Sequence, residues 1–270
     1  MQSLQQVSTS ATSRCNGYYL VGNGPRKVLV LHGWLFDAAS WSPVWQTADQ
    51  HAFTYCYIDA RGYGLSRQRG GEYTMDEIAH DALTVADSLG WQEFSLVGHS
   101  MAGLAIQRAL LQAPERIRAL VGVAAVPASG GGLVGSRRAL FDGAITDWEA
   151  RAAVIDGSTG NRRGEGWVRA LTERSFACCE IDAVRGYLDS WGDGDFHADV
   201  RGNPVAVGVI VGEHDPSLTP QRMADTWLSW YPNHRLTVLD DCGHYPMDEQ
   251  PCALAGAIDR VLVNHVAEVG

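Results

Sequence analysis

Short apolar runs recur along the chain and are separated by polar, helix-forming segments. A continuous apolar run is typical of a strand that is buried on both faces of a parallel sheet. We therefore expect strands at residues 17–21, 27–31, 53–58, 94–97, 117–123, 205–211 and 235–239. The first of these runs is the weakest, and the first sixteen residues are polar.

Helical patterns lie between most of these runs. Thr74 followed by Glu77 predicts a capping box, and the apolar positions between residues 78 and 89 repeat at helical spacing. Gly90 suits the end of that helix. Further helices are expected at residues 101–112, at 221–230 and from Pro251 onward. The alternation of strands and helices predicts an α/β fold with a mostly parallel sheet covered on both faces.

The alternation is interrupted at residues 128–199, where no strand-like run occurs. Helical stretches are expected there around residues 136–141, 148–155, 166–177 and 182–191. Because an unstructured loop of this length is uncommon, we predict a helical insertion that caps the carboxyl edge of the sheet. Residues 1–127 and 200–270 would then form the core domain. Trp148, Trp167 and Trp191 are candidates to line a pocket, or else to form the core of the insertion itself.

Composition narrows the class of protein. Hydrophobic residues make up 46% of the chain, as in soluble globular proteins, and the formal charge is −10 with no basic run. These features argue against nucleic acid or an anionic membrane as a partner. The chain shows neither a signal-peptide pattern at its start nor an apolar run of membrane length, so we expect a cytoplasmic location. The six cysteines lack a disulfide spacing, and adjacent Cys178 and Cys179 are expected to be reduced.

One stretch predicts a strand, a sharp turn and a helix around a serine. The apolar run 94–97 stops at Gly98, Ser100 follows, and a helical pattern begins at once. Small residues at Gly98 and Ala102 would let the strand and the helix approach closely enough to hold Ser100 in a strained turn. Ser100 is therefore the first candidate for a nucleophile.

Ser100 is one of five chemically capable side chains that follow predicted strands. The five are His32, Asp59, Ser100, Asp215 and His244. Ligands bind at the carboxyl edge of open parallel sheets, so this coincidence predicts a site there. The sequence shows no spacing typical of metal ligands and no phosphate-binding glycine loop, and we expect no metal.

The segments 31–34, 59–66, 98–102, 212–215 and 243–244 carry a family likeness. Together they resemble the α/β-hydrolase superfamily, in its subgroup with a helical cap, over nearly the whole chain from residue 17. Their order matches the family order of nucleophile, acid and histidine. The resemblance implies an α/β-hydrolase fold. The turn at residues 98–102, which we call the elbow, departs from the commoner pattern because it ends in Ala102 rather than glycine. This change is small enough to be harmless.

A serine needs a base, and the base needs a carboxylate that fixes its tautomer. His244, on a loop after the last strand, is the candidate base. Asp215 is favoured as the acid, with Glu213 as its main rival, because both follow the strand at 205–211. Asp240 and Asp241 fit solvated turn residues better.

The resemblance also assigns the oxyanion donors to the backbone N–H groups of Trp34 and Met101. His32, directly before that loop, is a candidate pocket residue, although it is usually structural in this family. The glycine-rich stretch 59–66 with Arg61 is interpreted as structural.

The expected function is cofactor-independent serine hydrolysis of a small or medium carboxylic ester or lactone, with a small molecule as the partner. Cleavage of a carbon–carbon bond in a ring-fission product is one alternative. It would need cap residues that bind a carboxylate, for which the candidates are Arg162, Arg163, Arg169, Arg174 and Arg185. Perhydrolysis is another, and a ligand receptor on the same fold is an alternative of a different class. Dehalogenation is disfavoured because it uses an aspartate where Ser100 stands. The sequence does not indicate an oligomeric state.

Overall fold

The computed structural model describes residues 4–7 and 15–264. Its centre is one eight-stranded sheet in the order β1-β2-β4-β3-β5-β6-β7-β8. The strands are β1 Leu4–Val7, β2 Tyr18–Gly22, β3 Arg26–Leu31, β4 Phe53–Ile58, β5 Phe94–His99, β6 Ile117–Val123, β7 Ala206–Gly212 and β8 His234–Leu239. Strand β2 pairs antiparallel with β1 and β4, and the remaining pairs are parallel.

All seven strands predicted from the apolar runs are present, with ends that differ by at most two residues. Strand β1 was not predicted, because Leu4–Val7 reads Leu-Gln-Gln-Val and carries no apolar run. It pairs with β2 at the edge of the sheet, where backbone hydrogen bonds alone can add a strand.

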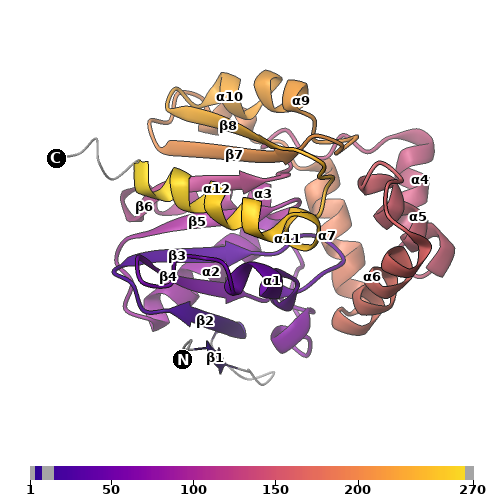
Figure 1. Ribbon diagram of the computed structural model, residues 1–270, viewed down its shortest axis with the longest axis horizontal. Helices are drawn as coiled ribbons and strands as arrows, with labels where there is room; N and C mark the ends of the chain where they lie inside the picture. The colour runs from indigo at the N-terminus through magenta and orange to yellow at the C-terminus, as the bar shows by residue number, and fades with distance from the viewer. Residues whose placement is uncertain (1–3, 8–14, 265–270) are drawn as a thin grey trace.

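Helices cover both faces of the sheet (Figure 1). Helices α1 and α12 lie on one face, and α2 and α3 lie on the other. Outside residues 128–199 the α-helices are α1 Ser42–Trp45, α2 Met75–Ser88, α3 Ala102–Gln112, α9 Pro220–Asp225, α10 Trp227–Trp230, α11 Pro246–Glu249 and α12 Pro251–Asn264. The helix expected at 221–230 is split into α9 and α10, because Thr226 leaves the helical region with φ −121° and ψ −96°.

The start of α2 shows one half of the predicted capping box. The Thr74 hydroxyl accepts the N–H of Glu77 at 3.1 Å. The Glu77 carboxylate does not return to Thr74. It accepts the N–H of Tyr73 at 3.0 Å and pairs with Arg61 at 3.0 Å, so it closes the preceding loop instead. At the other end Gly90 has φ +70°, the left-handed conformation expected after a helix.

The interruption at residues 128–199 contains the four expected helices. They are α4 Gly135–Gly143, α5 Trp148–Ser158, α6 Glu165–Cys178 and α7 Ile181–Asp193, followed by the short α8 His197–Val200. Helices α4, α5 and α6 lie beyond the carboxyl ends of the parallel strands (Figure 1). We call residues 128–199 the helical insertion, and its standing as a separate cap domain remains a prediction.

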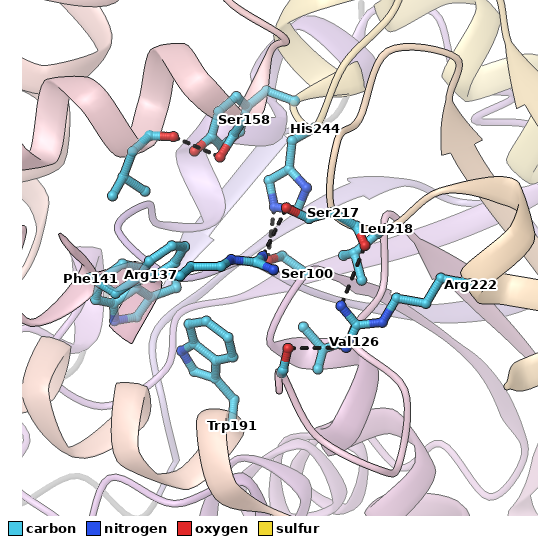
Figure 2. Close-up of a pocket in the computed structure, with 14 residues that line it drawn as sticks. Ser100, Val126, Arg137, Phe141, Ser158, Trp191, Ser217, Leu218, Arg222 and His244 are labelled. Carbon is cyan, nitrogen blue, oxygen red and sulfur yellow. Dashed lines mark hydrogen bonds between the residues drawn. The ribbon is translucent and has the colours of Figure 1, made fainter. Parts of the chain in front are cut away.

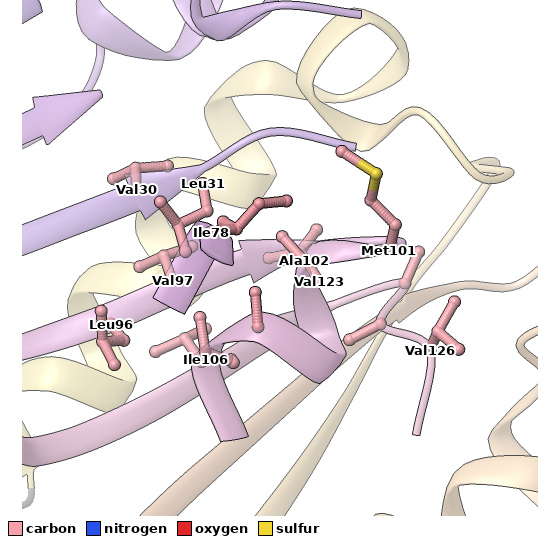
Figure 3. Packing of buried hydrophobic residues seen from close by; sticks show 14 of the residues in the cluster. Val30, Leu31, Ile78, Leu96, Val97, Met101, Ala102, Ile106, Val123 and Val126 are labelled. Atoms are coloured by element: carbon pink, nitrogen blue, oxygen red, sulfur yellow. The ribbon is translucent and has the colours of Figure 1, made fainter. Parts of the chain in front are cut away.

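The apolar core lies between the central strands and α3 (Figure 3). Leu96 and Val97 on β5 and Ile106 on α3 have no exposed surface. Each such side chain contributes about 1.5–3 kcal/mol by leaving water. This packing fixes the end of β5 and the start of α3, and therefore the turn between them.

Two further observations bear on the chain as a whole. Within residues 4–7 and 15–264, no helix has the length and apolarity to cross a membrane. The cysteines are free thiols, adjacent Cys178 and Cys179 included, as predicted. The cytoplasmic location inferred from the sequence remains a prediction.

Candidate active site

Ser100 lies in a strained turn between β5 and α3. Its φ is +53°, which costs a residue with a side chain about 1–3 kcal/mol. The turn is held by backbone hydrogen bonds, since the Ser100 N–H donates to Val123 at 3.0 Å and the Ser100 carbonyl accepts from Val126 at 2.9 Å. A Cβ at Gly98 would lie 2.6 Å from the carbonyl oxygen of Ala102, so the strand and helix approach as closely as the sequence predicted.

Three side chains from separate strand ends form one hydrogen-bonded line. His244 Nε2 lies 2.9 Å from Ser100 Oγ, and His244 Nδ1 lies 2.7 Å from Asp215 Oδ2. With Nδ1–H donating to the carboxylate, Nε2 is left to accept the serine proton. This arrangement can activate a hydroxyl as a nucleophile.

Asp215 is buried and fully hydrogen-bonded. Its second oxygen accepts the N–H groups of Ser217 at 2.8 Å and Leu218 at 2.9 Å. Burial raises the pKa of the Asp215 carboxyl, but His244 and these two N–H donors outweigh burial and leave the pKa below its ordinary value. Asp215 therefore stays ionised at neutral pH and can stabilise a charged imidazole.

The rival acid, Glu213, takes no part in this line. Its side chain is half exposed, accepts the N–H of Asp241 at 3.1 Å and lies 3.3 Å from His214. The structure thus brings Asp215, and not Glu213, to His244.

A second histidine supports the loop that carries His244. His99 Nε2–H donates to the carbonyl of His244 at 2.8 Å. Burial, followed by the nearby His244 ring, lowers the pKa of His99 to about 3, so His99 is neutral at physiological pH. On the other side, the His244 N–H donates to the carbonyl of Ser158 in the helical insertion at 3.1 Å.

The loop after β3 passes directly beside Ser100. A Cβ at Gly33 would lie 2.4 Å from His99 Nδ1 and 3.1 Å from Ser100 Cβ, so only glycine fits there. Among the described residues, neither the Trp34 N–H nor the Met101 N–H donates to a protein acceptor. Both remain candidate donors to an oxyanion, as the sequence predicted.

His32 does not line the cavity next to Ser100, and the prediction that it does is corrected here. Its Nδ1–H donates to the Gly33 carbonyl at 2.9 Å, and its Nε2 accepts the Ala60 N–H at 3.0 Å. Burial lowers the pKa of His32 to about 4. His32 is therefore a neutral side chain that fixes the backbone of two loops.

The 59–66 stretch is also structural. Buried Asp59 accepts the N–H groups of Ala38 at 2.7 Å and Leu65 at 2.8 Å. Arg61 pairs with Asp81 at 2.8 Å and with Glu77 at 3.0 Å. These contacts join the loops on which the site stands.

A cavity lies beside Ser100, between the sheet edge and the helical insertion (Figure 2). One part of its wall is aromatic. The Trp34 ring stacks on Phe141 at 5.4 Å and meets the edge of Trp191 at 5.8 Å. Another part is polar and contains Arg137 and Arg222. The cavity wall therefore offers apolar contacts on one part and cationic, hydrogen-bonding groups on another.

Of the three tryptophans predicted for the pocket, only Trp191 lines this cavity. Trp148 stacks on Phe176 at 5.8 Å, and its side chain is partly exposed. Trp167 lies 6.4 Å from the ring of Tyr245, one layer behind the cavity wall. Helical spacing alone does not say which aromatic side chains of an insertion meet the core.

The cap arginines considered for a substrate carboxylate do not line the cavity. Four of them pair with carboxylates instead: Arg162 with Asp241, Arg163 with Glu249, Arg169 with Glu173 and Arg174 with Asp248. Arg185 is also absent from the wall. Sequence reasoning missed Arg137 and Arg222, which belong to no motif. Within the described chain, no group of three or more His, Cys, Asp or Glu side chains could hold a metal ion.

Comparison with known proteins agrees with this architecture. A relative from Nitrosomonas europaea, a pimeloyl-[acyl-carrier protein] methyl ester esterase, is 28% identical over 252 residues, covering 89% of this chain and 96% of its own. The 2-hydroxymuconate semialdehyde hydrolase of Pseudomonas putida is 27% identical over 223 residues, covering 78% of this chain and 75% of its own. A thermophilic esterase from Thermogutta terrifontis superposes with a TM-score of 0.78 at 20% identity, covering 97% and 99% of the two chains.

The family model described as "Alpha/beta hydrolase family" matches residues 28–257. That span begins in β3, takes in the elbow and the helical insertion, and ends within α12. The protein belongs to the α/β-hydrolase family.

Proposed function

We propose that this protein is a cofactor-independent serine hydrolase that cleaves a small or medium carboxylic ester or lactone through an acyl-enzyme on Ser100. The observation that carries the proposal is the position of His244, hydrogen-bonded to Ser100 on one side and to Asp215 on the other. The likeness to a methyl ester esterase supports an ester as the substrate class.

Acylation follows from these contacts. His244 Nε2 takes the proton of Ser100 as Oγ bonds to the ester carbonyl carbon, and the charge that develops on the carbonyl oxygen is met by the N–H groups of Trp34 and Met101. The C–O bond to the alcohol then breaks, and His244 gives its proton to the leaving oxygen. Asp215 stabilises the imidazolium in between.

Deacylation repeats these steps with water. A water molecule loses a proton to His244 Nε2 and attacks the acyl carbon. When the bond to Ser100 breaks, the same proton returns to Oγ and the carboxylic acid leaves. For a lactone the alcohol and the acid are two ends of one product.

The helical insertion would act as a cap over this chemistry. It supplies Phe141 and Trp191 to the cavity wall and fixes His244 through the Ser158 carbonyl. Such a wall keeps bulk water from the reacting atoms and selects a small-molecule substrate by shape.

The test is turnover of an ester and lactone panel by the wild type and Ser100→Ala. Removing a serine nucleophile lowers kcat by about a thousandfold or more. Ser229→Ala, an exposed serine on α10, is the matched control and should keep full activity. Wild-type rates in Ser100→Ala would contradict the proposal.

Carbon–carbon hydrolysis is a second candidate, favoured by the likeness to 2-hydroxymuconate semialdehyde hydrolase. It would use the same three side chains, so the panel should include a dienone-type ring-fission product. Faster Ser100-dependent turnover of that compound than of any ester would favour it. Single turnover of every compound would instead favour a ligand receptor, and halogenation or peracid formation with peroxide would favour perhydrolysis.

A further inference from the structure

Two arginines reach the cavity without a carboxylate partner. Arg137 comes from α4 and Arg222 from α9, and neither forms an ion pair within the described residues. Both contact Ser217, whose hydroxyl accepts from Arg137 at 2.8 Å and whose carbonyl accepts from Arg222 at 3.3 Å. Figure 2 shows both side chains reaching into the cavity that Ser100 also lines.

The neighbouring residue on α4 makes the contrast clear. Arg138 lies next to Arg137 in the sequence and contacts three carboxylates, those of Asp142, Asp189 and Asp193. Arg137 is more exposed than Arg138, lines the cavity and has no such partner.

The two cavity arginines also repel each other. Burial, followed by the charge of Arg137, lowers the pKa of Arg222. Asp215 opposes this effect, but its carboxylate is already engaged by His244. Arg222 is partly buried and Arg137 is exposed, and neither has a carboxylate partner within the described residues. An anionic ligand placed near both guanidinium groups would offset their mutual repulsion.

Unused donors surround the same space. Arg137 has five N–H groups and gives one of them to Ser217. The hydroxyl hydrogen of Ser217 has no acceptor among the described residues, and neither has the buried indole N–H of Trp191. Arg222 differs, since it also donates to the carbonyls of Gly130 and Gly131, both at 3.0 Å. Arg137 thus has more free donors than Arg222, and Arg222 adds a second positive charge to the cavity wall.

We propose that Arg137, with the Ser217 hydroxyl and the charge of Arg222, binds a free carboxylate carried by the substrate. The substrate class is then a half-ester of a dicarboxylic acid. Its ester group would lie at Ser100, and its free carboxylate would be held by Arg137. This inference rests on the proposed ester hydrolysis. The reaction consumes one water and gives the dicarboxylate, the alcohol and one proton. A guanidinium with two parallel donors is the side chain best matched to a carboxylate.

The kinetic test compares monomethyl adipate with methyl hexanoate, which has the same length and lacks the carboxylate. The wild type should show the higher kcat/KM for the charged ester. Arg137→Gln should lower the ratio of the two kcat/KM values about tenfold or more, because a charged hydrogen-bonded pair is lost. Ser217→Ala should lower the ratio by less. Arg169→Gln removes a cap charge outside the cavity wall and should leave the ratio unchanged.

A binding test reads the same site without turnover. Calorimetric titration of monomethyl adipate into Ser100→Ala should show binding that weakens about tenfold when Arg137→Gln is added, with a matching loss at high salt. Thermal melting checks that both variants fold.

The outcomes separate the two proposals. Ser100-dependent hydrolysis of both esters with a ratio that Arg137→Gln does not change overturns the carboxylate site alone. Arg137-dependent binding without Ser100-dependent hydrolysis overturns the proposed function and keeps the carboxylate site. Binding to Ser100→Ala that is equal with and without Arg137 overturns the site whatever the kinetics show.

Discussion

Helix α3 of the core and helix α4 of the helical insertion are built differently. In α3, eight of the eleven residues are buried, whereas α4 has no buried residue among its nine. The core positions Ser100 by packing. The insertion positions Arg137 on a helix held largely by polar contacts such as those of Arg138. We infer that the core determines which reaction occurs and that the insertion determines which substrate enters the cavity.

The largest effect should come from the acid in the core. Asp215→Asn keeps the shape but removes the charge that orients and stabilises His244, and kcat for an ester should fall about a thousandfold to ten-thousandfold. Glu213 is the rival acid two residues earlier, and Glu213→Gln should keep kcat within about twofold of the wild-type value. The reverse ranking in steady-state kinetics would assign the acid to Glu213 and break the account of the core.

The next effect tests how polar contacts hold the insertion. Arg151 is buried on α5, where it donates to the carbonyls of Ala144 at 2.7 Å and Ile145 at 2.6 Å and lies over the Phe176 ring at 3.6 Å. Arg151→Met leaves two carbonyls unpaired and should lower the free energy of unfolding by about 2 kcal/mol. Exposed Arg169→Met should cost less than about 0.5 kcal/mol by the same denaturant titration. Equal losses would show that Arg151 contributes no special support.

A smaller effect is expected from the aromatic wall that the insertion supplies. Trp191→Ala removes a ring that lines the cavity and should raise KM about tenfold, with a lesser effect on kcat, because binding surface is lost. Trp148→Ala changes the same residue type outside the wall and should leave KM near the wild-type value. If Trp148→Ala raises KM more than Trp191→Ala does, the cavity is wrongly located.

A last effect, measured as a slope, concerns pH and the core alone. The folded-state pKa of His99, about 3, lies below its ordinary value of 6.5, so the unfolded chain binds a proton that the folded chain excludes. Stability from this group is complete above pH 6.5 and is lost as pH falls toward 3, by up to about 1.4 kcal/mol per pH unit. Asp59, with its pKa raised to about 8, acts in the opposite sense, but it is common to wild type and variant.

Comparison with His99→Gln isolates that slope. Glutamine can still donate to the His244 carbonyl but does not titrate. The free energy of unfolding, measured by denaturant titration, should therefore fall less steeply between pH 6.5 and 4.5 for the variant than for the wild type. Parallel curves would show that His99 is not kept neutral by burial.

The sequence predicted the core well because its signals are local. Apolar runs mark strands buried on both faces, and the family pattern marks the turn at Ser100 and the histidine at 244. The edge strand β1 was missed because edge pairing needs no apolar side chains. The predicted contact from Glu77 back to Thr74 is absent, because Arg61 and the N–H of Tyr73 bind the Glu77 carboxylate instead.

The cavity wall was much harder to predict. Helical periodicity indicates which side of an insertion helix is buried, but not whether that side meets the core, another helix or an open space. Trp191 and Trp148 look alike in the sequence and differ in the structure. Arg137 and Arg138 are adjacent, yet Arg137 lines the cavity whereas Arg138 contacts three carboxylates. Such differences depend on the packing of the whole insertion.

The central claim is that Ser100 is a nucleophile activated by His244. It is tested most directly by treating the native protein with a fluorophosphonate and mapping the adduct by peptide mass spectrometry. The account predicts one rapid adduct on Ser100, strongly slowed in His244→Ala and absent in Ser100→Ala. An adduct on another residue, or unchanged labelling of Ser100→Ala, would contradict it.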